Sequence, residues 1–211
     1  MSESSGSDSL SSEPLLKYHR VQGVVPQLLS DSVDGLGDKV SVALLHEHYL
    51  LIGTFDGAVL QLDREGKLIR RNQQHRDKIT GLSTDLDGGV YASCSEDGRV
   101  VIYSAIGDGK VTVHNFHHPI RAIQLDPLFS KQRDNAFVCG GTAGKLMMKK
   151  KGWFSNADTE IHKGEGTISD ISWQGDLIAW SNESGVKIYD YTLEQRIAYV
   201  ERPPGSGIPC R

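Results

Sequence analysis

The sequence predicts an all-β fold of about four four-stranded units, and two repeating features carry this prediction. The first is a glycine that closes a tight turn between two apolar runs, at Gly57, Gly98, Gly144 and Gly185, with spacings of 41, 46 and 41 residues. The second is a histidine that lies 23 to 26 residues before each of the last three glycines. Asp-Gly and Ser-Gly pairs accept the positive φ that a two-residue hairpin turn requires. We therefore expect strand, turn and strand to recur along the chain.

Each unit is expected to contain four strands, and the last three units begin at His75, His118 and His162. The apolar runs around each turn glycine are rich in the β-branched and aromatic residues typical of strands. No long stretch repeats its apolar residues every 3.6 positions, so we expect little helix. The units span residues 39–71, 75–115, 118–161 and 162–200, with weaker fourth strands at Lys67–Arg71, Lys110–Asn115, Trp153–Ile161 and Arg196–Val200.

A period of 40 to 45 residues with four strands per unit is typical of a WD-repeat-type β-propeller blade. Stacking blades around an axis buries both apolar faces of each sheet. The Trp-Asp pair that ends a typical repeat is absent here, so the repeat is degenerate. A β-sandwich or small barrel is the competing interpretation, although neither would need this period.

Four blades are fewer than degenerate propellers of this type usually have. We therefore expect an incomplete ring, and an unusual four-bladed ring is the alternative. An incomplete ring leaves two open apolar faces, one at each end, and such faces promote aggregation. The isolated chain is therefore expected to be marginal in solution.

Composition separates the ends of the chain from its centre and excludes several classes of protein. Residues 1–14 hold seven serines and three acidic groups, which predicts a disordered acidic tail. The partial propeller is expected at 15–200 and a truncated inter-blade loop at 201–211. A net charge of −4 argues against nucleic acid as a partner. Three cysteines without a CxxC pair exclude a disulfide framework and a cysteine zinc site, which favours a reducing intracellular compartment.

The most basic stretch of the chain is Lys149, Lys150 and Lys151, followed by Trp153 and Phe154. Basic residues beside exposed aromatic side chains suit an anionic membrane surface or an acidic partner. The competing interpretation is a solvated strand end with Trp153 packed between blades. The three lysines are the candidate anionic-surface contact of this chain.

The other motifs predict structural roles, and the spacing of the residues suggests no catalytic, cofactor or metal site. Gly141–Lys145 has too short a spacing for a phosphate loop and precedes a strand, so it predicts a hairpin turn. His46 and His48 lack further zinc ligands nearby and predict a polar turn. His118 fits the repeat position that braces a blade by hydrogen bonding. Inter-blade or core packing is expected for Trp173, Trp180, Cys94 and Cys139.

Several motifs resemble the N-terminal WD-repeat propeller of the vacuolar protein sorting-associated protein 41 family, especially its plant members. The longest is residues 162–182, HKGEGTISDISWQGDLIAWSN, followed by GVKIYD at Gly185–Asp190 and by Gln195–Ile197. Shorter matches are Leu16–Tyr18, Cys94–Gly98, Gly140–Gly141, Trp153–Phe154 and Glu201–Pro203. The resemblance covers about residues 15–206.

This resemblance implies a non-enzymatic subunit of the HOPS tethering complex, which acts before late endosomes and vesicles fuse with vacuoles or lysosomes. It implies contacts with other HOPS subunits, with small GTPases of the Rab and Arl classes and with a coat adaptor of the AP type. It also implies a cytoplasmic protein at the surface of late endosomal and vacuolar or lysosomal membranes. Two alternatives are a WD-repeat scaffold of an unrelated complex, such as a ubiquitin-ligase substrate receptor, and an enzyme with a site in the central channel.

Overall fold

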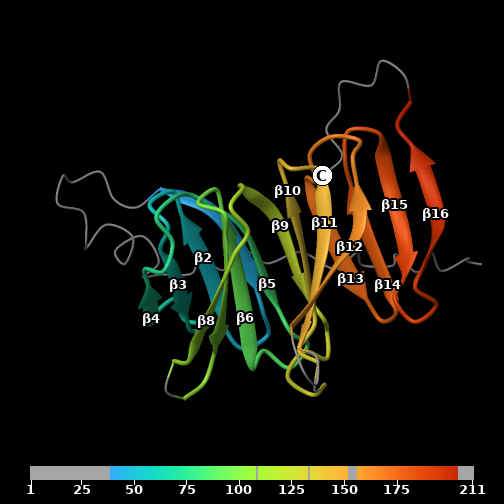
Figure 1. The fold of residues 1–211 in the computed structure, drawn as a ribbon. Helices are drawn as coiled ribbons and strands as arrows, with labels where there is room; N and C mark the ends of the chain where they lie inside the picture. Colours follow the sequence, from blue (N-terminus) through green and yellow to red (C-terminus); the bar gives the residue numbers. More distant parts are fainter. Residues whose placement is uncertain (1–38, 108, 133, 152–155, 204–211) are drawn as a thin grey trace, which may run out of the picture.

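The computed structural model describes residues 39–107, 109–132, 134–151 and 156–203, and every regular element in these ranges is a β-strand (Figure 1). The expected tail at 1–14, residues 204–211 of the expected loop, and Trp153 and Phe154 lie outside the described residues.

The strands form four antiparallel sheets, each with its four strands in sequence order. The first sheet contains β1 (Val40–Leu45), β2 (Leu50–Thr54), β3 (Val59–Leu62) and β4 (Leu68–Asn72). The second contains β5 (Ile79–Thr84), β6 (Val90–Ser95), β7 (Arg99–Ser104) and β8 (Val111–Asn115). The third contains β9 (Ile120–Leu125), β10 (Phe137–Gly141), β11 (Lys145–Lys151) and β12 (Asn156–Lys163). The fourth contains β13 (Asp170–Gln174), β14 (Leu177–Ser181), β15 (Gly185–Asp190) and β16 (Gln195–Glu201).

The four sheets lie side by side as blades of an open arc, with the first and fourth sheets at opposite ends (Figure 1). The first strands of neighbouring blades contact one another in the order β1, β5, β9 and β13. Side chains connect these strands: Thr80 Oγ1 donates to the carbonyl of Ile120 at 2.6 Å, and Ser83 Oγ donates to Gln124 Oε1 at 2.6 Å. The prediction of an incomplete, four-bladed, all-β propeller is confirmed.

Apolar clusters fill the three interfaces between neighbouring blades. The cluster between blades one and two includes Leu51 and Tyr91, and the one between blades three and four includes Val138, Trp173 and Trp180. Cys94 and Cys139 lie in the cluster between blades two and three. The expected inter-blade or core positions of both tryptophans and both cysteines are therefore confirmed.

The turn glycines close their hairpins as expected, although most of the loops are one residue longer than expected. Gly57, Gly98 and Gly144 have φ values of 84°, 78° and 65°. Each of their amides donates to the carbonyl three residues earlier, as in a type I turn followed by a left-handed glycine. These are three-residue loops. Of these four turns, only the one before Gly185 is a two-residue connection, closed by the 2.9 Å bond from the Asn182 amide to the Gly185 carbonyl.

The two outer faces of the arc differ. On the first sheet, Ile52, Leu60 and Leu62 form a separate buried cluster with 0 to 3% exposure. On the far side of the fourth sheet, Leu177 and Val200 are 44% and 62% exposed. The expectation of two open apolar faces is therefore wrong for the first sheet and holds for the fourth.

Candidate functional site

The three candidate lysines occupy the end of β11 and have different surroundings. Lys149 forms an ion pair with Asp158 at 2.9 Å and lies 5.3 Å from the ring centroid of Phe116. Lys150 points toward the fourth blade, where its ammonium lies 4.2 Å from the ring centroid of Tyr191. Lys151 is exposed. This alternation follows from the strand geometry, because successive side chains point to opposite faces.

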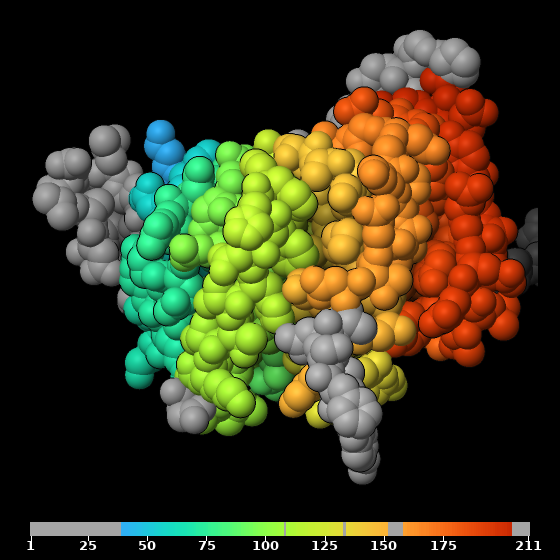
Figure 2. Space-filling view, in the orientation of Figure 1, coloured from blue at the N-terminus to red at the C-terminus, as the bar shows by residue number. Residues whose placement is uncertain are grey.

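These lysines border a cleft of about 420 Å³ between the second and third blades, which we call the lysine cleft. Its apolar lining comes from both blades and consists of Val90, Ile102, Tyr103, Phe129 and Phe137. Phe129 and Phe137 are 7% and 2% exposed, so the apolar part is recessed. Figure 2 shows the green surface of the second blade directly beside the yellow and orange surface of the third.

The polar lining of the cleft is cationic. Lys110 and His114 contribute from the second blade, and the three lysines of β11 contribute from the third. Its other polar side chains are uncharged, and no described residue that lines it carries a carboxylate. Burial lowers the pKa of His114, Lys149 lowers it further, and Asp158 opposes both effects. His114 is therefore neutral near pH 7, and the positive charge of the cleft comes from its lysines.

Sequence reasoning identified the lysines of β11 but missed the rest of the cleft. Val90 and Ile102 lie on neighbouring strands of the second blade, Phe137 lies on a strand of the third, and each looks like an ordinary core residue. Lys110 follows Gly109 and lies 39 residues before Lys149 in the sequence. No signal in a single sequence indicates that these residues share one cleft.

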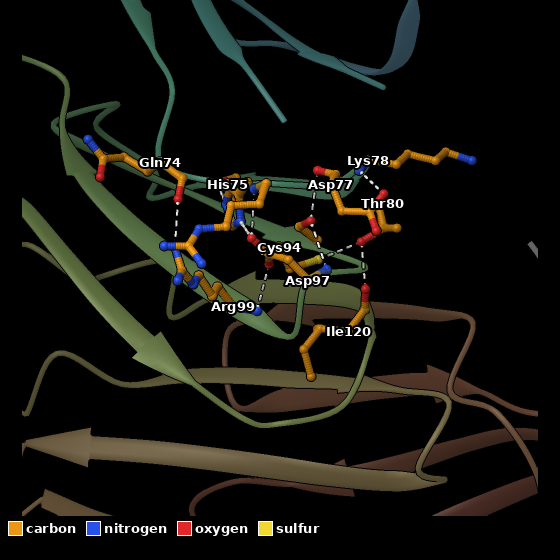
Figure 3. A network of polar contacts seen from close by, with 12 residues as sticks. Gln74, His75, Asp77, Lys78, Thr80, Cys94, Asp97, Arg99 and Ile120 are labelled. Carbon is orange, nitrogen blue, oxygen red and sulfur yellow. Dashed lines mark hydrogen bonds and ion pairs between the residues drawn. The ribbon is translucent and has the colours of Figure 1, made fainter. Parts of the chain in front are cut away.

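A second polar cluster lies in the second blade, where Figure 3 shows His75 beside Asp97, and a serine completes it. His75 Nδ1 lies 3.2 Å from Asp97 Oδ1, and His75 Nε2 lies 2.7 Å from Ser93 Oγ. The hydroxyl oxygens of Ser93 and Tyr103 lie 3.2 Å apart. The sequence spacing suggested no such set, because its members come together only through the pairing of strands.

The geometry of this cluster gives it a bracing role. The side chain of His75 is 0% exposed, and that of Asp97 is 8% exposed. Asp97 also accepts hydrogen bonds from the backbone amides of Arg76 and Arg99. Burial alone would raise the pKa of Asp97, but these two bonds and His75 together lower it. Burial lowers the pKa of His75 more than Asp97 raises it. A neutral histidine therefore connects a turn to the middle strands of its blade.

Among the described residues, the bracing bond expected of His118 does not form at its Nδ1 atom. The Nδ1 atom of His118 is buried and has no hydrogen-bond partner in the described part of the chain. The reason is visible in the repeat: where Asp97 precedes Gly98, Ala143 precedes Gly144 and cannot accept a bond. His162 instead contacts the carbonyl of Gly164 at 3.1 Å.

The two remaining motifs have the structural roles expected of them. His46 and His48 lie in the turn between β1 and β2, with ring centroids 5.3 Å apart. The segment Gly141–Lys145 forms the hairpin turn between β10 and β11, where Lys145 pairs with Glu160 at 3.2 Å. Within the described ranges, no three His, Cys, Asp or Glu side chains are grouped so that they could hold a metal ion. In the same ranges, no helix has the length and apolar character needed to cross a membrane.

Comparison with known proteins agrees with this architecture. A family model of the Vps41 β-propeller, described as "Vps42 beta-propeller", matches residues 16–208. A vacuolar protein sorting-associated protein 41 homolog of Arabidopsis thaliana is 41% identical over 93% of this chain and 20% of its own length. The Homo sapiens homolog of the same name is 35% identical over 90% of this chain and 21% of its own length. This chain thus spans about a fifth of these curated relatives.

Among solved structures, the Cps50 (Swd1) β-propeller domain of Myceliophteria thermophila is similar in fold. Its TM-score is 0.68 with 18% identity, over 79% of this chain and 56% of that one. At this identity the likeness supports the propeller fold alone. The match of the family model, by contrast, spans all sixteen strands. This chain belongs to the Vps41 β-propeller family.

Proposed function

We propose that this chain is a non-enzymatic interaction scaffold that acts in a vesicle-tethering complex during transport to the vacuole or lysosome. The observation that carries the proposal is the family match over residues 16–208, together with relatives whose names specify vacuolar protein sorting. A propeller of packed blades suits this role because it offers rigid surfaces without requiring movement.

The proposed partners are the other HOPS subunits, small GTPases of the Rab and Arl classes and a coat adaptor of the AP type. The proposed location is cytoplasmic, at the surface of late endosomal and vacuolar or lysosomal membranes. The proposed anionic contact is made by Lys149, Lys150 and Lys151. The Ser-His-Asp set of Ser93, His75 and Asp97 is buried, which supports a scaffold over a hydrolase.

The experiment is a chimaera of the Arabidopsis thaliana relative in which residues 16–203 of this chain replace the matched segment. We expect the chimaera to restore vacuolar sorting in plant cells that lack the relative. A matched chimaera carrying blades of an unrelated WD-repeat protein serves as the control and should not restore sorting. A chimaera that is present at normal levels and co-purifies with ubiquitin-ligase subunits, without restoring sorting, would support the alternative scaffold instead.

A further inference from the structure

The lysine cleft combines a recessed apolar lining with a cationic rim, and this combination restricts what can occupy it. Its volume of about 420 Å³ lies in the range of ligand sites, roughly 300 to 1,000 Å³. Ile102, Phe129 and Phe137 would contact an apolar group, whereas Lys110 and Lys151 would attract negative charge. Lys149 already pairs with Asp158 at 2.9 Å, but its ammonium carries three N–H donors and can contact a second carboxylate. An occupant therefore needs an apolar side chain flanked by acidic groups.

We propose that the lysine cleft binds an acidic, extended peptide segment of a partner protein, with one aromatic or long aliphatic side chain inserted between blades two and three. This proposal rests on the proposed scaffold function and specifies the partner chemistry of the same lysines. Lys149 and Lys151 point to the same side of β11, about 7 Å apart. Acidic side chains at alternate positions of an extended peptide repeat at the same distance.

The arrangement favours a peptide over a compact anion or a membrane. Lys149 and Lys151 lie along the end of β11 and Lys110 lies before β8 on the other blade, whereas recognition of a single phosphate would require cationic side chains that converge on one point. The aromatic lining is also recessed, since Phe137 is 2% exposed, so a flat bilayer surface cannot reach it. A side chain that projects from a peptide can enter the cleft, as aromatic anchors do at protein interfaces.

Lys145 provides a matched control on the same strand. It lies at the first residue of β11, pairs with Glu160 at 3.2 Å and does not line the cleft. Lys145→Gln therefore removes the same charge as Lys151→Gln but at the other end of β11 from the proposed peptide. Thr112, an exposed residue of β8 that lines the cleft, allows a second and independent variant, because Thr112→Phe fills the space without removing charge.

The test uses the complete chain fused to maltose-binding protein, which keeps it in solution, and the fluorescein-labelled peptide Glu-Asp-Phe-Glu-Asp as the probe. Fluorescence anisotropy should show binding that weakens as NaCl rises from 50 to 300 mM, because exposed charge pairs are screened. Replacing the phenylalanine of the peptide by serine should abolish most of the binding. Maltose-binding protein alone serves as the blank.

Each variant has a defined expectation. Lys110→Gln with Lys151→Gln should weaken binding about tenfold, as expected for two exposed charge pairs. Thr112→Phe should weaken binding at least as much, whereas Lys145→Gln should change it less than twofold. Circular dichroism verifies that each variant is folded, and Thr112→Phe keeps the test decisive if the double variant is not.

The proposal is overturned if the peptide does not bind at 1 mM, or if the double variant and Thr112→Phe both bind like the unmodified chain. It is also overturned if phosphatidylserine vesicles bind through Lys110 and Lys151 while the peptide does not, since the surface would then contact a membrane. Displacement of the peptide by 5 mM inorganic phosphate would also overturn the proposal, because it would indicate a general anion site. Because the peptide assay does not depend on sorting in cells, it can fail while the chimaera restores sorting. It can also succeed while the chimaera does not restore sorting.

Discussion

Replacing His75 with alanine should destabilise the second blade, because the neutral imidazole connects the Asp97 turn to Ser93 in β6. The change removes the contact to Asp97 at 3.2 Å and the contact to Ser93 at 2.7 Å, and it leaves a cavity at a fully buried site. A hydrogen bond to a charged group contributes about 1.5 to 3 kcal/mol, and a neutral one about 1 kcal/mol. Asp97 keeps the amides of Arg76 and Arg99, so the expected loss is about 3 kcal/mol.

Hydrogen exchange measured by mass spectrometry on the maltose-binding protein fusion checks this value at β6. A loss of about 3 kcal/mol corresponds to a roughly 100-fold drop in the protection of these amides. His48→Ala is the matched control, since His48 is exposed in the β1–β2 turn and should change protection by less than twofold. Unchanged protection in His75→Ala would refute the bracing role assigned to the buried cluster.

Three further predictions concern pH, packing and thiol reactivity. Burial lowers the pKa values of His75, His114 and His162, so below about pH 6.5 the unfolded chain binds more protons than the folded chain. Urea melts should therefore show that the free energy of unfolding falls as the pH falls. An unchanged free energy of unfolding between pH 7 and 5 would contradict this. Gly140→Ala should cost about 1 to 3 kcal/mol in the same exchange assay, because the added Cβ would lie 2.9 Å from Ile168 Cβ; an unaffected third blade would show that the interface adapts. Burial raises the pKa of the Cys94 thiol to about 12 and that of Cys139 well above its ordinary value. In a Cys210→Ser variant, neither thiol should therefore react with DTNB until the chain is denatured. Rapid labelling of the native protein would contradict the buried positions of both thiols.

The sequence predicts most of the fold because the repeat leaves local signals. The turn glycines and the apolar runs around them located the hairpins, and the expected fourth strand at Lys110–Asn115 appears as β8 at Val111–Asn115. Turn length was less predictable, because a left-handed glycine serves both two-residue and three-residue loops. The bracing bonds also differ between blades. Asp97 precedes the turn glycine of the second blade, whereas Ala143, which cannot accept a hydrogen bond, takes the same position in the third.

The candidate site was predictable only where its residues are adjacent in the chain. Lys149, Lys150 and Lys151 stand out as a basic run, but the sequence does not indicate that Lys150 faces Tyr191 while Lys149 pairs with Asp158. The apolar lining, which includes Phe137, depends on how two blades stack. Inter-blade surfaces combine residues from distant strands, so only the structure reveals them.

The open four-bladed arc is the central feature of this structure, and light scattering after size exclusion tests it directly on the unfused 211-residue chain. The far face of the fourth sheet exposes Leu177 and Val200, and uncovered apolar sheet surface drives association. We expect self-association with a β-type circular dichroism spectrum, and a shift toward monomer when both residues are changed to lysine. A monomer of the unmodified chain that melts cooperatively would contradict the account, because it would mean that four blades are stable without any cover on this face.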